Sequence, residues 1–277
     1  MSARRMCAAA QVSRASYYRF VGSVAEDPDM ELRSVVQKIA LSRPSYGYRR
    51  VQAELERRGH QVNHKRVRRI MREDNLLCVR RRSFVRTTDS KHGFTVYPNL
   101  AKEMVLTNIN QLWVADITYI RLRSEFVYLA VILDAYSRRV IGWELSNSLA
   151  VELALGALRM ALNGRRFAPG LVHHSDRGVQ YAANDYTQLL RERQIQISMS
   201  RRGNPYDNAQ AESFMKTLKY EEVYRSDYYD QRDVRSNVGR FLEKVYNEKR
   251  LHSALSYVPP AEFERELLKP KVIEANA

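Results

Sequence analysis

Hydrophobic residues in the first third of the chain recur every three or four positions, which is the spacing of an amphipathic helix. Three such stretches follow one another, at about 29–42, 48–58 and 64–74. Gly59 follows the second stretch as a C′ residue should, and Asn63 is a good N-cap for the third. The pattern therefore predicts a small all-α, helix-turn-helix-like module.

From about residue 111 the pattern changes to short apolar runs that are typical of strands. Leu112–Arg121, Phe126–Asp134 and Arg139–Ser146 predict three strands joined by short turns, which together form an antiparallel meander. The further predicted elements are a helix at 150–163, a strand at 171–174, a helix at 184–193, a strand at 195–198 and a long helix that ends near residue 224. This order is that of a ribonuclease H-like domain. We therefore predict an α/β fold with a mixed five-stranded sheet and flanking helices, preceded by the small all-α module.

These elements divide the chain into five segments. They are a short helical fragment (1–28), a helix-turn-helix-like DNA-binding domain (29–77), a basic linker (78–110), a ribonuclease H-like catalytic core (111–226) and a C-terminal helix and tail (227–277). The formal net charge of +15 indicates a polyanionic partner. Residues 1–100 hold 21 Lys and Arg against 9 Asp and Glu, whereas residues 101–277 hold 25 against 22. This segregation favours nucleic-acid binding by the first third and catalysis by the nearly balanced remainder.

Cysteine content and hydropathy bear on the compartment. Cys7 and Cys78 provide neither a disulfide framework nor a four-thiolate metal site, which favours the reducing cytosol. No apolar run approaches the ~20 residues that a membrane span needs. We expect a cytoplasmic protein with no membrane partner.

Three carboxylates lie where the predicted elements could bring them to one edge of the sheet. Asp116 is inside the first strand and Asp176 ends the fourth, and these two strands are neighbours in such a fold. Glu212 lies on the final helix, for which Asp207 is a predicted N-cap and Gln210 completes a capping box. Hard divalent cations prefer oxygen ligands, so this triad in a basic chain predicts metal-assisted chemistry on nucleic-acid phosphates.

Cations accompany both predicted sites. Lys216 and Lys219 share the helix face of Glu212, four and seven residues further on. The helix at 64–74 has the character of a recognition helix for a DNA groove, and a run of three arginines follows it. The residues predicted to contact DNA here are Lys65, Arg66, Arg68, Arg69 and Arg72 on the helix, with Arg80, Arg81 and Arg82 after it.

The residues around the acids are more specific than the acids alone. The stretch 174–178 is His-Ser-Asp-Arg-Gly, and 203–214 is Gly-Asn-Pro-Tyr-Asp-Asn-Ala-Gln-Ala-Glu-Ser-Phe. Together with Trp113–Tyr119 and the stretch from Tyr246 to Ala261, they resemble the Asp-Asp-Glu transposases. The specific similarity is to the second-frame (OrfB-type) protein of bacterial insertion-sequence family three, which has a retroviral-integrase-like catalytic core.

The resemblance implies a function and a set of partners. Asp116, Asp176 and Glu212 would be the catalytic residues and the ligands of two Mg²⁺ ions, which Mn²⁺ can replace. Lys219 matches the basic DNA-contact position of the family, and Lys216 is similar to an integrase lysine. The expected protein is a nucleoid-associated bacterial DNA transposase that catalyses metal-dependent 3′-end cleavage and strand transfer of an insertion sequence. Its expected partners are double-stranded DNA of the transposon ends and the target, further copies of itself on the DNA, and a first-frame protein, separate or fused.

Other interpretations stay open at this point. A ribonuclease H-like nuclease or junction resolvase would share the fold and the metals but would only hydrolyse DNA. A repressor built on residues 30–77 and an inactive transposon remnant are further alternatives. Among other polar residues, Asp134 at a strand end is expected to be structural, and His174 to support the acids at most.

Overall fold

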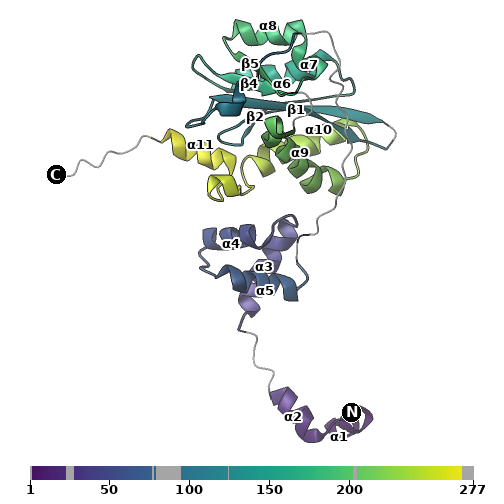
Figure 1. The fold of residues 1–277 in the computed structure, drawn as a ribbon. Helices are drawn as coiled ribbons and strands as arrows, with labels where there is room; N and C mark the ends of the chain where they lie inside the picture. Colours follow the sequence, from purple (N-terminus) through teal and green to yellow (C-terminus); the bar gives the residue numbers. More distant parts are fainter. Residues whose placement is uncertain are drawn as a thin grey trace, which may run out of the picture. The chain divides into compact units, whose positions relative to one another are not determined.

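A computed structural model describes most of the chain in two compact units, residues 1–80 and 81–277, which we treat separately (Figure 1). The described residues are 2–22, 28–76, 78, 95–123, 125–201 and 205–269. Among them, no helix combines the length and apolar character that crossing a membrane requires.

The first unit is helical, and its helices begin and end where local side-chain chemistry indicates. Ser13 Oγ accepts a hydrogen bond from the Ser16 amide at 2.9 Å, and Asn63 Oδ1 accepts one from the Lys65 amide at 2.8 Å. Gly59 has a φ of +84°, a conformation that glycine adopts without strain. The predicted N-cap at Asn63 and C′ glycine are confirmed. The helices are α1 (Ala3–Ala9), α2 (Arg14–Gly22), α3 (Met30–Ser42), α4 (Tyr48–Arg57) and α5 (His64–Glu73).

The second unit is built on the predicted mixed five-stranded sheet. Its order is β3-β2-β1-β4-β5, with β1, β2 and β3 antiparallel and with β4 parallel to both β1 and β5. The first and fourth strands are therefore neighbours, as predicted. The strands are β1 (Leu112–Arg121), β2 (Phe126–Asp134), β3 (Val140–Ser146), β4 (Val172–Ser175) and β5 (Gln196–Met199).

Helices cover both faces of this sheet and bury a separate apolar layer on each (Figure 1). Successive residues of β1 alternate between the layers, because strand side chains point to opposite faces. Trp113 and Ala115 pack in one layer, and Leu112 and Val114 pack in the other. The first layer is covered by α6 (Val151–Gly164), α7 (Val179–Ala182) and α8 (Asn184–Glu192), and the second by α9 (Ala209–Glu221) and α10 (Gln231–Arg240).

The C-terminal segment is more than the single helix and tail predicted for 227–277. After α10 come a π-helical turn (Phe241–Tyr246) and a final helix, α11 (Pro260–Leu268). The turn belongs to the same apolar layer as α9. The single-helix prediction was wrong, because the apolar positions here are sparse and gain their partners only once the sheet exists. The end of the predicted basic linker is also part of the folded unit, since Met104 and Leu106 pack against the same apolar layer.

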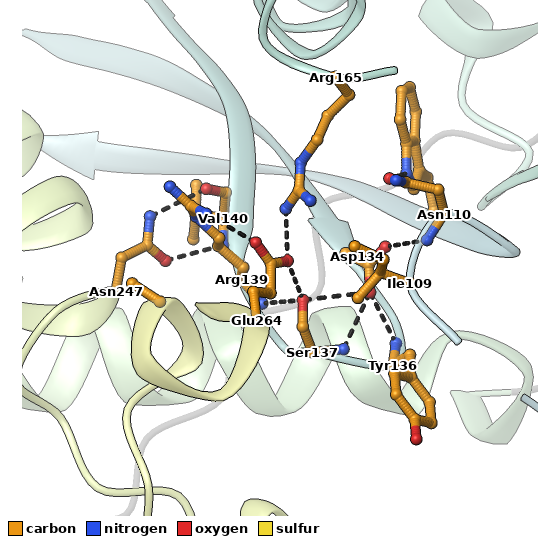
Figure 2. A network of polar contacts seen from close by, with 12 residues as sticks. Ile109, Asn110, Asp134, Tyr136, Ser137, Arg139, Val140, Arg165, Asn247 and Glu264 are labelled. Carbon is orange, nitrogen blue, oxygen red and sulfur yellow. Dashed lines mark hydrogen bonds and ion pairs between the residues drawn. The ribbon is translucent and has the colours of Figure 1, made fainter. Parts of the chain in front are cut away.

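A buried polar network fastens this C-terminal segment to the sheet (Figure 2). The Asn247 side chain makes two hydrogen bonds to the backbone of Val140, accepting from its amide and donating to its carbonyl, both at 2.9 Å. Glu264 is only 2% exposed. Its carboxylate accepts hydrogen bonds at 2.6 Å from Ser137 Oγ, Arg139 Nη1 and Arg165 Nη2.

Asp134 belongs to the same network and not to the candidate site. Its buried carboxylate accepts hydrogen bonds from the backbone amides of Asn110 (2.6 Å), Tyr136 (3.0 Å) and Ser137 (2.9 Å). A carboxylate engaged in this way closes the turn after β2, which is the structural role expected for it.

Candidate functional site

The parallel pairing of β1 with β4 brings two of the three acids to the same level of the sheet. Val114 lies opposite His174, and Asp116 and Asp176 each follow two residues later. Residues two apart in a strand point to the same face. Asp116 therefore shares the face of Val114, which packs in the layer under α9.

Asn208 ties the start of α9 to β1 beside Asp116. Its buried side chain donates a hydrogen bond from Nδ2 to the carbonyl of Ala115 at 3.1 Å. Glu212 lies in the first turn of α9, so this tie sets its height relative to Asp116. The sequence analysis gave Asn208 no role of its own. Its place in the Asp-Asn dipeptide before the helix is the signal that could have found this role.

The predicted N-cap of this helix was wrong by one residue. Asn208, not Asp207, precedes the first helical residue, because residues 205–208 form a 3₁₀ turn. The Asp207 carboxylate instead accepts hydrogen bonds from the backbone amide of Arg201 at 2.8 Å and from its guanidinium at 3.1 and 3.2 Å. These contacts lower the pKa of Asp207 to about 2 and leave its side chain no part in the predicted capping box.

The electrostatics of Asp116 show that the three acids share one environment. The pKa of Asp116 is raised to about 8, mainly by burial and in smaller part by the charges of Asp176 and Glu212. The backbone amide of Ile117, which donates to Asp116 Oδ1 at 2.9 Å, and the charge of Lys219 act in the opposite direction. A site in which carboxylates repel one another is stabilised by a cation placed between them.

The donor set fits a divalent metal, since carboxylate oxygens are the ligands that hard cations prefer. Asp176 is held by the backbone amide of Gly178, which donates to Oδ1 at 2.9 Å. Glu212 is turned towards Lys216, with 3.9 Å between carboxylate oxygen and ammonium nitrogen, and its side chain is 41% exposed. Among the described residues no three acidic, histidine or cysteine side chains already converge on one point. Sharing an ion would require Glu212 to change rotamer, which an exposed side chain can do.

Lys219 lies between the acids and an aromatic ring. Its ammonium nitrogen is 4.8 Å from the ring centroid of Tyr119 on β1, which is a cation–π contact. Burial lowers the pKa of Lys219, whereas the Asp116 charge raises it. Lys219 thus remains close to Asp116 while its ammonium is partly shielded from water. The sequence analysis missed Tyr119, although it lies in the same strand motif as Asp116.

His174 links β4 to β5 two residues before Asp176. Its two ring nitrogens contact Ser198 Oγ at 2.7 Å and Ser200 Oγ at 3.0 Å. Burial lowers the pKa of His174 and favours the neutral ring. These contacts hold β4 against β5 directly before Asp176, which agrees with the supporting role expected for His174.

In the helical unit, two of the cations predicted to contact DNA have partners within the unit. The Asp29 side chain, at the start of α3, is buried and forms ion pairs with both Arg66 and Arg69 on α5. The two arginines lower the pKa of Asp29. Arg33 on α3 also pairs with Glu73 at the end of α5. These contacts cross-link α3 and α5.

The other cations of α5 point elsewhere. Within the described part of the chain, Lys65 and Arg72 form no ion pair, and the Arg68 guanidinium lies 5.8 Å from the ring centroid of Tyr48. Arg49 lies 5.5 Å from the same ring. Arg80, Arg81 and Arg82 fall outside the described residues. Of the five cations predicted to contact DNA from α5, Arg66 and Arg69 are thus also engaged within the unit.

Comparison with known protein families agrees with this division. A family model described as an integrase core domain matches residues 107–205, and a second with the same description matches residues 193–260. A model described as an HTH-like domain matches residues 27–84.

Individual relatives match over nearly their whole length. An insertion element IS600 uncharacterized 31 kDa protein from Shigella sonnei is 38% identical over 93% of this chain and 97% of the relative. The transposase InsF for insertion sequence IS3A of Escherichia coli is 34% identical over 96% of this chain and 95% of the relative. Among solved structures, the catalytic core domain of BIV integrase matches with a TM-score of 0.44 at 18% identity, over 57% of this chain and 95% of that one.

Proposed function

Because this chain belongs to the insertion-sequence transposases that carry an integrase core domain, we propose that Asp116, Asp176 and Glu212 are the residues with which it cuts and joins DNA. The expected DNA transposase is thereby confirmed, and the nuclease alternative gains no support from the relatives. The observation that carries the proposal for the triad is the pairing of Val114 with His174, two residues before Asp116 and Asp176, together with the Asn208 hydrogen bond that ties the start of the Glu212 helix to Ala115 at 3.1 Å.

The proposed reaction has two steps, and neither forms a bond to the protein. In the first, water attacks a phosphodiester at the end of the element, its P–O3′ bond breaks, and a free 3′-OH results. In the second, this 3′-OH attacks a phosphodiester elsewhere, a new P–O bond forms, and the displaced 3′ oxygen takes up a proton. Each step exchanges one P–O bond for another, so no external energy source is needed.

Asp116, Asp176 and Glu212 would hold divalent cations, which we propose to be two Mg²⁺ ions. When bound, the cations supply Lewis-acid activation of the attacking oxygen and charge stabilisation of the leaving oxygen. Asp116, whose pKa is raised by both other acids, would be one of the ligands. Lys219 would contact the phosphate backbone next to the cut. Lys216 would make a similar contact once the Glu212 side chain turns away from it. Because two element ends must be processed, we propose that at least two copies act together on the DNA.

The helical unit would bind the duplex with the cations that are not used internally. We assign this role to Lys65, Arg68 and Arg72, whereas Arg66 and Arg69 would stabilise the unit through Asp29. An element end bound by the helical unit would be delivered to the catalytic unit of the same or another copy.

A strand-transfer assay tests the catalytic proposal. Labelled duplex carrying the terminal sequence of the encoding element is incubated with the full chain and Mg²⁺ or Mn²⁺. Products longer than the input are expected, and Asp116→Asn or Glu212→Gln should abolish them while DNA binding persists. Strand transfer that survives in either variant would contradict the triad. Shortened products alone would favour a nuclease that only hydrolyses.

A binding assay separates the two groups of cations on α5. Arg68→Ala should weaken duplex affinity about tenfold and reduce the slope of log affinity against log salt by about one. Arg66→Ala, two residues away on the same helix, is the matched control, and it should mainly lower the stability of the unit because Asp29 loses a partner. Equal losses of affinity in both variants would refute the division.

A further inference from the structure

Two exposed and two half-buried aromatic side chains cluster near the proposed catalytic acids. We call this cluster the aromatic strip, and it consists of Tyr119, Phe126, Tyr220 and Tyr224. Tyr119 on β1 and Phe126 on β2 meet edge to face, with ring centroids 5.6 Å apart. Tyr220 at the end of α9 and Tyr224 in the following 3₁₀ turn form a second such pair, also at 5.6 Å. Phe126 is 47% exposed and Tyr224 is 50% exposed, so aromatic surface is available to a ligand.

The two pairs form one continuous surface. The Tyr224 hydroxyl lies close enough to Tyr220 and to Tyr119 for both to raise its pKa, after the larger effect of burial. Lys219 reaches from α9 to Tyr119, as described above. The strip therefore begins where Lys219 approaches Asp116 and continues to the β1–β2 hairpin.

Cations flank the strip, and the nearby acids on α9 are engaged elsewhere. The Arg121 guanidinium lies 6.0 Å from the Phe126 ring centroid, and Arg225 donates to the Tyr220 carbonyl at 2.9 Å. Glu221 is held by the buried Arg250, with nitrogen–oxygen distances of 2.8 to 3.0 Å. Glu222 accepts a hydrogen bond from the Tyr228 hydroxyl at 3.2 Å. The surface thus combines open rings with positive charge.

We propose that the aromatic strip binds unpaired bases of the DNA strand adjoining the cut. Aromatic rings stack on any base, and interspersed cations hold the backbone, which is how proteins bind single strands without sequence preference. Bases inside a duplex do not offer their faces, so the strip requires a locally opened end. Its continuity with Lys219 and Asp116 favours DNA over a protein partner as the occupant. The inference rests on the proposed function, because it assigns a ligand to the surface next to the proposed catalytic acids.

The test measures binding of a single strand by the full chain. The probe is an oligodeoxythymidine carrying one fluorescent adenine analogue, whose emission is quenched when it stacks on an aromatic ring. Phe126→Leu and Tyr224→Leu should each weaken binding about tenfold and relieve the quenching, while affinity for a duplex stays nearly constant. Tyr224→Trp keeps a stacking surface and should retain both binding and quenching.

Tyr136→Leu is the matched control, since it removes a ring just beyond the other end of β2. It should leave single-strand binding and quenching unchanged. Unchanged binding in Phe126→Leu and Tyr224→Leu would overturn the proposal, and so would equal losses for single strand and duplex. A change of oligomeric state at constant DNA affinity would identify the strip as a contact between copies and would also overturn it.

These outcomes are separable from those of the strand-transfer assay. A wild-type chain that joins DNA, with strip variants that bind single strands normally, would remove the strip proposal alone. A wild-type chain that fails to join DNA under all cation conditions, with strip variants that still lose single-strand binding, would remove the catalytic proposal and keep the strip.

Discussion

Replacing Asp116 by Asn should stabilise the metal-free protein, and increasingly so as the pH rises. In the wild type the folded-state pKa is raised from 3.8 to about 8. The unfolded chain therefore releases this proton near pH 4, whereas the folded protein keeps it until about pH 8. An acid of this kind contributes stability at low pH that is lost progressively across that interval. Asn keeps the shape and can accept the Ile117 hydrogen bond, but it has no charge to bury.

The magnitude follows from the size of the interval. At about 1.4 kcal/mol for each pH unit, the range from 3.8 to about 8 sets an upper limit of about 6 kcal/mol. Water entry and rotation of Glu212 towards solvent relieve much of this penalty. We expect the unfolding free energy of Asp116→Asn to exceed that of the wild type by about 2 kcal/mol more at pH 8 than at pH 5.

Urea unfolding in the presence of a chelator measures this difference, and the fully buried Trp113 provides a fluorescence signal. Asp185→Asn, which removes an exposed acid on α8, is the control. The difference between its unfolding free energy and that of the wild type should not vary with pH. Adding Mg²⁺ should then stabilise the wild type and not Asp116→Asn, because only a protein with the ligand gains from binding. If the difference in unfolding free energy between Asp116→Asn and the wild type did not depend on pH, the electrostatic argument would be refuted. Equal stabilisation of the wild type and Asp116→Asn by Mg²⁺ would refute the role of Asp116 as a ligand.

Three further predictions concern packing, the buried network and the metal. Gly142→Ala should lower the unfolding free energy by about 3 kcal/mol or more, because its Cβ would lie 2.2 Å from the Ala157 carbonyl oxygen. The control Gly164→Ala, whose Cβ meets nothing within 4 Å, should change the unfolding free energy by less than about 1 kcal/mol, and similar urea midpoints for the two variants would contradict this prediction. Glu264→Gln leaves two arginines without their buried anion and should cost about 3 kcal/mol, whereas Glu266→Gln at an exposed site should cost almost nothing. Chelation should abolish strand transfer and either Mg²⁺ or Mn²⁺ should restore it, so persistence of joining in excess chelator would exclude the metal proposal.

The features that could be predicted from sequence are those that depend on nearby residues. The N-cap at Asn63 and the C′ glycine at 59 follow from side-chain and backbone chemistry within one turn of a helix. The antiparallel meander followed from short turns, and the pairing of the first strand with the fourth followed from the ribonuclease H-like order of the elements. That order alone predicts that Asp116 lies next to Asp176.

Most of the features that could not be predicted depend on distant partners. The helix start moved to Asn208 because that amide reaches a carbonyl of β1, and Asp207 found a better partner in Arg201. Arg66 and Arg69 look like exposed recognition residues in the helix pattern, and only the packing of α3 on α5 reveals Asp29 between them. The contacts of Asn208 and Asp29 join segments far apart in the chain, which conceals them, whereas Asp207 and Arg201 are only six residues apart and their contact was missed because Asp207 was expected to cap the helix.

The anchoring of the last helix has a consequence for how the protein is made. Asp116, Asp176 and Glu212 are all synthesised before residues 247 and 264. The buried polar groups of Val140 and Arg165 therefore gain their partners, Asn247 and Glu264, only after all three acids have been made. At bacterial elongation rates the last ~50 residues take roughly 3–10 s, during which the sheet has unsatisfied polar groups that disfavour closure. A nascent chain, or one released early by a stop codon, would therefore remain a substrate for cellular proteases rather than an unregulated DNA-cutting fragment.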